Sequence, residues 1–342
     1  MKSRTEDGSE LRRDMVSGDW ILVAAKRAKR PQAERTREKI PSLKSGCPFD
    51  DPQKGGTGEP LLWLAHPEAG KKGPASFSDW WVQIIPNKYP ALSPHHVCPE
   101  EVSDGPYFKM AGTGFHEVII TRDHDRRISE MNVQEVAVLL EAYQERYKVI
   151  SKEPCIEYTL IFHNQGPEAG ASIYHPHSQL IALPIIPPDV RKSLEGSRQY
   201  YVQKGKCVHC AMLEWELAQK ERVVFENEGF AVFEPYASRV SYETRIFPKK
   251  HSARFEEMDS FLRAELAEAL QKTLGKIKNG MGDPDYNFFI HTAPAQPDGI
   301  DYYHWHVEIL PKTAIWAGLE LGTGVEVIAI SPEEAALELK KS

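Results

Sequence analysis

The chain has 342 residues, 41% of them hydrophobic, and a formal net charge of −7 at pH 7. This length predicts a sizeable core divided between two domains, and the acidic balance argues against a nucleic-acid-binding protein, which usually carries a basic excess. No apolar run approaches the roughly 18 residues that a membrane span needs, the first residues lack the apolar stretch of a secretory signal, and five cysteines do not indicate a disulfide framework, so we expect a cytoplasmic enzyme.

The beginning of the chain is polar and rich in turn-forming residues. The basic run AAKRAKRP ends at Pro31 and is followed by PQAERTREKIPSLKSG, which we expect to be a loop or a disordered stretch. The Gly- and Pro-containing segments DPQKGGTGEP and HPEAGKKGPAS are typical of loops.

A regular order of elements begins after these loops. Residues 79–92 (DWWVQIIPNKYPAL) predict a strand that ends in a turn, and residues 115–121 (FHEVIIT) predict a second strand. Residues 129–150 have the periodicity of a helix. Strands are then expected at residues 156–164 (IEYTLIFHN) and 173–184 (IYHPHSQLIALP), separated by the glycine-containing loop QGPEAGAS.

The second half of the sequence repeats this order. Residues 222–238 parallel the segment around residues 79–92, residues 242–248 (YETRIFP) predict a strand, and residues 256–277 predict a helix. The strand YNFFIHT, the loop APAQPDGID and the strand YYHWHVEILP complete the copy. The segment 188–222 links the two copies, and we expect part of it to be helical.

The repetition in register predicts a duplicated α+β unit, in which mostly antiparallel sheet is covered by helices. We place the N-terminal half at residues 1–195 and the C-terminal half at residues 196–342. In this alignment the pair His175 and His177 of the first copy corresponds to the pair His304 and His306 of the second.

The strand YHPHSQL contains the strongest chemical signal. His175, His177 and Gln179 occupy alternate positions, so an extended strand places all three on one face. Exposed strand histidines are the simpler interpretation, but the strand is otherwise apolar, and the preceding loop has small residues whose N–H groups can approach a phosphate. The pattern favours a neutral imidazole that attacks phosphorus and forms a covalent intermediate.

Gln179 refines this hypothesis, because an amide cannot transfer a proton at neutral pH but can donate a hydrogen bond to a phosphoryl oxygen. That suits a leaving group that departs as an anion, such as a sugar 1-phosphate.

The motif HPHSQ, preceded by HNQGPEAGAS, resembles the galactose-1-phosphate uridylyltransferase branch of the histidine-triad superfamily. The resemblance covers nearly the whole chain, because LRRDMVSGDWILVAAKRAKRP resembles the N-terminal segment of that family and HWHVEILP resembles its second-half strand. It implies duplicated histidine-triad-like halves, a homodimer, and a nucleotide sugar and a sugar 1-phosphate as substrates.

The resemblance also implies individual roles. His177 would be the nucleophile that carries the nucleoside monophosphate, and Gln179 would contact the phosphoryl group. The expected substrate-binding residues are Arg27, Arg30, Asn87, Asn164, Ser172 and Glu326. Arg27 and Arg30 match arginines near the phosphates, one of which a partner subunit could supply; without the family match, the basic run would be interpreted as a solvated surface.

A zinc site is predicted in the second half. The sequence CVHC places Cys207 and Cys210 at the spacing with which two thiolates bind one zinc ion, and a redox pair is the alternative. We expect His251 and His306 to complete the site, with His304 able to replace or join His306.

A second zinc site is predicted in the first half, in the segment GCPFDDP. Here Asp50 stands where the family usually has the second cysteine. Aspartate also binds zinc through oxygen, so Cys47, Asp50, His116 and His175 form the expected set. The alternative is a buried free thiol beside a surface acid. With both sites we expect one or two zinc ions per chain.

The two remaining cysteines, Cys98 and Cys155, have no evident partner in the sequence.

Two nucleotides fit this mechanism. We expect UMP to move from UDP-glucose to galactose 1-phosphate through His177. The alternative is an AMP transfer from an ADP-sugar to phosphate, because NKYPALS, HPHSQLIALP and GLELGTG also resemble the ADP-glucose phosphorylase branch. A non-catalytic nucleotide-binding protein is a third possibility. Glu308 stands where Gln179 has its counterpart, which predicts one working site per chain.

Overall fold

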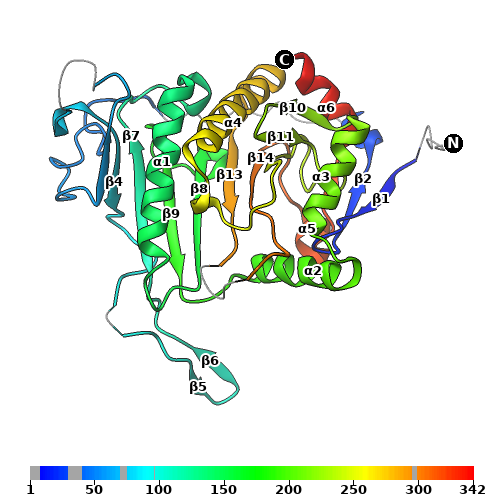
Figure 1. Cartoon of the computed structure of the whole chain (residues 1–342), viewed down its shortest axis with the longest axis horizontal. Coiled ribbons are helices and arrows are strands. Elements are labelled where there is room, and N and C mark those ends of the chain that lie inside the picture. The colour runs from blue at the N-terminus through cyan, green and yellow to red at the C-terminus, as the bar shows by residue number, and fades with distance from the viewer. Residues whose placement is uncertain (1–7, 30–40, 70–74, 96, 295–298) are drawn as a thin grey trace.

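One antiparallel sheet runs through both halves of the chain (Figure 1). The computed structural model describes residues 8–29, 41–69, 75–95, 97–294 and 299–342. Within these residues the sheet is formed by β3 (Leu62–Ala65), β4 (Trp80–Pro86), β7 (Phe115–Thr121), β8 (Tyr158–Gln165), β9 (His177–Leu183), β10 (Val223–Glu226), β11 (Phe230–Phe233), β12 (Thr244–Pro248), β13 (Tyr286–His291) and β14 (His306–Pro311).

The strand order confirms the duplication. The first copy is arranged β3-β4-β7-β9-β8 and the second β10-β11-β12-β14-β13, so the two series have the same pattern. Helix α1 (Val133–Ile150) lies between β7 and β8 in the sequence, and helix α4 (Ser260–Met281) lies between β12 and β13. Strands β8 and β13 join the copies with Asn164 opposite Asn287. The α+β fold class is confirmed; the division at residue 195 stays a prediction, because the sheet is continuous across the two halves.

Helices α1 and α4 pack together on one face of the sheet (Figure 1). The side chain of Asn132 caps the start of α1 by accepting a hydrogen bond from the Glu135 N–H, and Asp259 caps α4 in the same way. A cap satisfies an N–H group that the helix itself leaves without a partner. The buried faces of both helices, with Tyr143 of α1 and Leu270 of α4 among them, form the core against the sheet.

Two helices lie in the linking segment, as predicted. They are α2 (Pro188–Lys204) and α3 (Val208–Gln219). Gly196 of α2 lies against the turn between the first two strands, and a Cβ atom there would stand 1.7 Å from the carbonyl oxygen of Val16. The absence of a side chain therefore allows this turn to pack on the helix.

A small sheet covers the outer side of the second half, at the right of Figure 1. Strand β1 (Glu10–Arg13) pairs antiparallel with β2 (Trp20–Val23), and β15 (Val327–Ile328) pairs parallel with β2. The C-terminal helices are α5 (Gly318–Thr323) and α6 (Pro332–Lys341). The part of the chain that the structure describes has no helix long and apolar enough to cross a membrane.

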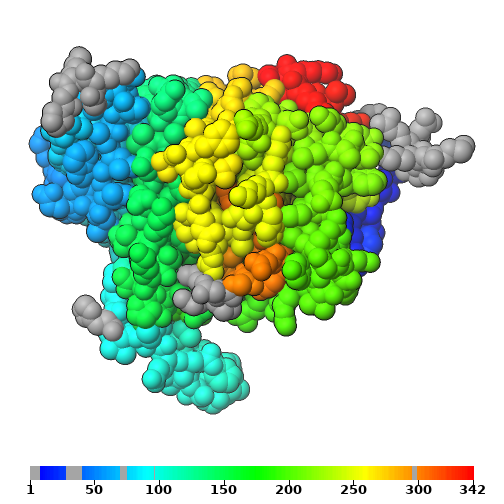
Figure 2. All heavy atoms as spheres, in the orientation of Figure 1, coloured from blue at the N-terminus to red at the C-terminus, as the bar shows by residue number. Residues whose placement is uncertain are grey.

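A two-stranded excursion projects from the body of the molecule (Figure 2). It consists of β5 (Val102–Asp104) and β6 (Tyr107–Lys109), within the connection between β4 and β7. Near its root, Cys98 forms a disulfide with Cys155. The expectation that these two cysteines lack a partner is wrong. They are 57 residues apart, and nothing in the sequence marks that approach.

Candidate functional site

His177 stands at the first position of β9 and is largely buried. Its Nδ1 lies 2.9 Å from the carbonyl oxygen of His175. A carbonyl only accepts, so Nδ1 carries the hydrogen and Nε2 keeps its lone pair. The ring of Phe49 packs 5.0 Å from the imidazole, centroid to centroid. Burial lowers the pKa of His177, although its bond to the His175 carbonyl acts in the opposite direction. The contact with the His175 carbonyl therefore orients the imidazole and leaves the lone pair of Nε2 free, which is the arrangement that a nucleophile requires.

The opposite face of the same strand is anchored in the core. Ser178 follows His177, so its side chain points to the other side of the sheet. Its hydroxyl bonds the hydroxyl of Tyr143 and lies 2.9 Å from Nδ1 of His163. The His163 ring stacks on Phe288, with centroids 5.1 Å apart, and burial lowers its pKa to about 3. This network fixes the strand that carries His177, and no motif in the sequence indicates it.

The glycine-containing loop between β8 and β9 has a backbone that requires glycine. Gly166 has φ +83°, and a Cβ atom there would stand 2.0 Å from Oδ1 of Asp285. The same carboxylate accepts a hydrogen bond from the Glu168 N–H at 2.7 Å. Asn164, at the end of β8, accepts a hydrogen bond from Asn287 at 2.7 Å, and Ser172 is exposed in the loop. The predicted phosphate-binding residues thus lie in and beside one tight turn.

Gln179 shares its face of β9 with His177, and its partner is His116. The amide oxygen Oε1 of Gln179 lies 2.8 Å from Nε2 of His116. Nδ2 of Asn87 lies 3.1 Å from the same nitrogen. The structure therefore brings His116 and Asn87 to the strand that carries His177 and Gln179.

The first group of possible metal ligands differs from the prediction in one member. It contains Cys47, Asp50, His124 and His175, with His124 in place of His116. The strand register explains the difference, because His116 pairs opposite Ile181, whereas Ile120 pairs opposite His177. His116 thus lies at the end of β7 that is farther from His175, whereas His124 follows the end that is nearer to His175.

The geometry of this group suits zinc. A tetrahedral zinc ion with bonds of about 2.0–2.3 Å holds its donors roughly 3.3–3.8 Å apart. Nδ1 of His175 lies 3.3 Å from the Asp50 carboxylate and 3.7 Å from Sγ of Cys47, and Nδ1 of His124 lies 3.0 Å from Asp50. Nε2 of His175 donates to the carbonyl of Thr121 at 2.7 Å, the outer contact that orients a metal-binding histidine.

The second group contains Cys207, Cys210, His251 and His304. Sγ of Cys210 lies 3.2 Å from Nδ1 of His251 and 3.5 Å from Nδ1 of His304, spacings close to those of a zinc site. This group contains His304, the alternative that the sequence left open, and not His306. The duplication explains this, because His304 is the counterpart of His175, which belongs to the first group.

His306 lies in a different environment, which is the counterpart of the His177 site. Its Nδ1 lies 3.1 Å from the carbonyl oxygen of His304, as Nδ1 of His177 does from His175. Glu308 bonds Arg239 and lies 3.5 Å from Nε of Arg245. Burial raises the pKa of Glu308, but the two arginines outweigh this effect and lower it to about 2.

His291, His306 and Glu308 come close enough together to be considered as metal ligands. The two guanidinium groups already neutralise Glu308, however, so the surroundings disfavour a further cation. The second copy therefore has the same orientation of the histidine, but a carboxylate, Glu308, stands where the first copy has the amide of Gln179.

The predicted residues Arg27 and Glu326 flank strands of the small sheet, not strands of the large sheet that contains His177. Arg27 is in the 3₁₀ helix Ala25–Lys29 that follows β2, and the carbonyl of Glu326 accepts a hydrogen bond from the Leu22 N–H at 2.9 Å. Figure 1 places this small sheet at the far edge of the molecule from β9. Burial raises the pKa of the Glu326 carboxyl. Arg30 lies outside the described residues.

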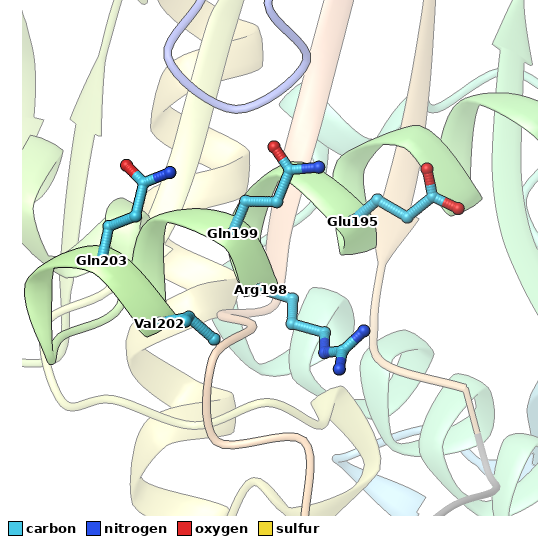
Figure 3. A pocket seen from close by; sticks show the side chains of 5 residues that line it. All are labelled: Glu195, Arg198, Gln199, Val202 and Gln203. Atoms are coloured by element: carbon cyan, nitrogen blue, oxygen red, sulfur yellow. The ribbon is translucent and has the colours of Figure 1, made fainter.

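A shallow pocket lies along α2, apart from this chemistry. No predicted site residue lines it, and the residues shown in Figure 3 all come from the one helix: Glu195, Arg198, Gln199, Val202 and Gln203. The pocket does not belong to the candidate site.

Comparisons with known proteins agree over nearly the whole chain. The family model described as galactose-1-phosphate uridyl transferase, N-terminal domain, matches residues 1–187, and the model of the C-terminal domain matches residues 193–321. An ADP-glucose phosphorylase from Arabidopsis thaliana is 32% identical over 338 residues, which cover 97% of this chain and 92% of that protein.

A galactose-1-phosphate uridylyltransferase from Thermotoga maritima is 29% identical and covers 97% of this chain and 98% of its own length. The crystal structure of an ADP-glucose phosphorylase from Arabidopsis thaliana with bound ADP-glucose superimposes with a TM-score of 0.82 and 30% identity. It covers 98% of this chain and 99% of that chain.

Proposed function

The chain belongs to the galactose-1-phosphate uridyl transferase family, and from this membership we propose that it transfers a nucleoside monophosphate from a nucleotide sugar through His177. The observation that carries the proposal is the buried imidazole whose Nδ1–H is held by the His175 carbonyl at 2.9 Å. That bond leaves Nε2 unprotonated, as a nucleophile requires. Burial, which lowers the pKa of His177, keeps it so at neutral pH.

The reaction proceeds in two displacements at the α-phosphorus. In the first, the Nε2 lone pair forms a P–N bond, the bond to the bridging oxygen breaks, and the sugar 1-phosphate leaves with that electron pair as an anion. In the second, a phosphate oxygen of the acceptor attacks phosphorus, and the P–N bond breaks to restore neutral His177. Neither step needs a proton donor at the leaving oxygen, which agrees with glutamine at position 179.

Charge that develops on the phosphoryl oxygens needs donors close to His177. Gly166 and Gly170 adopt the positive φ that turns a backbone back on itself. The Gly170 N–H already donates to the Pro167 carbonyl at 3.0 Å, so of these two glycines only Gly166 would offer its N–H to the phosphoryl group. The amides of Gln179 and Asn164 and the hydroxyl of Ser172 would supply side-chain donors.

We propose an ADP-sugar as the nucleotide donor, with phosphate or a sugar phosphate as the acceptor. The similarity to the ADP-glucose phosphorylase, at 32% identity and a TM-score of 0.82, supports this choice. The uridylyl transfer from UDP-glucose to galactose 1-phosphate that the sequence predicted is the second candidate. The family models and the uridylyltransferase from Thermotoga maritima support it.

We further propose that the site is completed in a homodimer. The small sheet lies on the side of the chain far from β9 (Figure 1), and Arg27 and Glu326 flank its strands β2 and β15, so a second subunit would bring them to the phosphates on His177. A mixture of inactive His177→Gly and inactive Arg27→Ala proteins should then regain activity after subunit exchange. A mixture that stays inactive while hybrid dimers form would overturn this assignment.

Zinc is proposed as a structural cofactor at both four-residue groups. When bound, it would hold the segment around Cys47 against His175, and the start of α3 against His304. The chain's own residues carry out the chemistry, because His175 presents its carbonyl to His177 whether or not its ring binds a metal.

Donor labelling tests the proposal. The protein is incubated with ADP-glucose or with UDP-glucose, each labelled in its α-phosphate, and acid-labile protein-bound label is counted. We expect label from ADP-glucose, and none in a His177→Gly variant. The matched control is His306→Gln at the equivalent position of the second copy, which should retain the label. Label from UDP-glucose alone would instead establish the second candidate, and label from neither would refute both.

A further inference from the structure

The ring of His116 is held at both of its nitrogens. It projects from β7 toward β9, where its Nε2 lies 2.8 Å from Oε1 of Gln179. On the other side of the ring, the backbone N–H of Ala91 donates to Nδ1 at 3.0 Å. The turn that begins at Asn87 wraps around this histidine, because the Asn87 N–H donates to the His116 carbonyl at 3.0 Å.

These contacts determine which ring nitrogen carries the hydrogen. A backbone N–H is fixed in direction and can only donate, so Nδ1 of His116 must be the acceptor. In a neutral imidazole the other nitrogen, Nε2, then carries the hydrogen and donates. Nδ2 of Asn87 lies 3.1 Å from Nε2, but it can only donate, so it cannot accept the hydrogen on Nε2. The Asn87 amide keeps this orientation because its Oδ1 accepts from the Tyr89 N–H at 2.9 Å.

The orientation of Gln179 follows from this order of donors. The group facing Nε2–H has to be an acceptor, so the amide oxygen of Gln179 points to His116. Its NH₂ group then points away from His116 and remains available to donate. Without this contact, the amide of Gln179 could rotate by half a turn and point its oxygen at the anionic phosphoryl group. The two oxygens would then repel each other.

We propose that His116 is a positioning residue, which fixes the amide of Gln179 so that its NH₂ group faces the phosphoryl group during transfer to His177. The chain of contacts runs from the Ala91 N–H through the His116 ring to the Gln179 amide. This role rests on the proposed function. It differs from the metal-binding role that the sequence predicted for His116. In the group of possible metal ligands, His124 stands in place of His116.

A double-mutant cycle tests the role. The rate constant for nucleotidylation of His177 is measured in single turnover with saturating labelled ADP-glucose, or UDP-glucose if only that nucleotide labels. His116→Leu should lower it by about 10²-fold, the usual cost of losing one donor to a developing oxyanion. The same substitution in a Gln179→Ala background should cause no further loss. His116→Gln, whose terminal NH₂ can replace Nε2–H, should recover most of the rate.

The possible outcomes separate this role from a structural one. An equal loss from His116→Leu in both backgrounds, or no loss in either, would overturn the proposal, since His116 would then not act through Gln179. Urea unfolding of each variant shows whether the compared proteins are folded, and the His116→Gln variant keeps the test decisive if His116→Leu is not. Failure of the proposed function would look different, because the wild-type protein itself would then acquire no label.

Discussion

The buried imidazole of His163 should make the stability of the protein fall steeply in mild acid. Burial lowers its folded pKa from 6.5 to about 3. The folded state therefore excludes a proton that the unfolded chain binds, so this contribution is complete above about pH 6.5 and is lost as the pH falls toward 3. Linkage gives RT ln(1 + 10^(6.5−5)), or about 2 kcal/mol of lost unfolding free energy at pH 5 from this one residue.

Urea unfolding at pH 7.5 and at pH 5 measures the effect by difference. Several buried histidines contribute to the pH dependence of the wild type, so its loss of stability is compared with that of His163→Phe. The substitution itself lowers the stability by the same amount at both pH values, and this amount cancels in the difference. The variant should lose about 2 kcal/mol less than the wild type between pH 7.5 and pH 5. His95→Gln, which removes an exposed histidine, is the matched control. Equal pH dependence in His163→Phe and the wild type would show that His163 does not lose a proton on folding.

Three further predictions concern the loop, the disulfide and the metal. Gly166→Ala should cost about 1–3 kcal/mol of stability, because φ is +83° and the Cβ atom would collide with a carboxylate; urea unfolding measures this, and an unchanged midpoint would contradict it. Cys98→Ala should cost roughly 4 kcal/mol by the chain-entropy model for the 57-residue separation from Cys155; thermal unfolding with and without reductant checks it, and a wild type insensitive to reductant would count against the bond. His304→Ala should lower the zinc content by about one ion per chain while His306→Ala should not; elemental analysis decides, and the reverse pattern would restore His306 as the ligand.

Much of the fold could be predicted from the sequence because the same order of elements occurs twice in the chain. The order of strand, helix, strand, loop and strand recurs in both halves, and the observed sheet has two copies of one strand pattern. The alternation in the strand that begins at His177 also predicted correctly that His177 and Gln179 share a face. The repeat could even have selected His304 over His306, since His304 is the counterpart of His175.

The remaining features depend on contacts that sequence spacing does not contain. The choice of His124 over His116 follows from the register of β7 against β9, and an antiparallel register is fixed only when the strands pair. The disulfide of Cys98 joins a surface excursion to the turn after α1. The contact between Gln179 and His116 likewise needs the structure. The two residues are 63 positions apart in the sequence, and their spacing gives no sign of the contact.

The most direct test of the account is the identity of the side chain that becomes bonded to phosphorus. The protein is mixed with its nucleotide sugar without an acceptor, digested, and analysed by fragmentation mass spectrometry under conditions that preserve P–N bonds. The account predicts the added mass of one nucleoside monophosphate on the peptide that contains His177, at that residue. The same mass on another side chain, or turnover without any modified peptide, would contradict it.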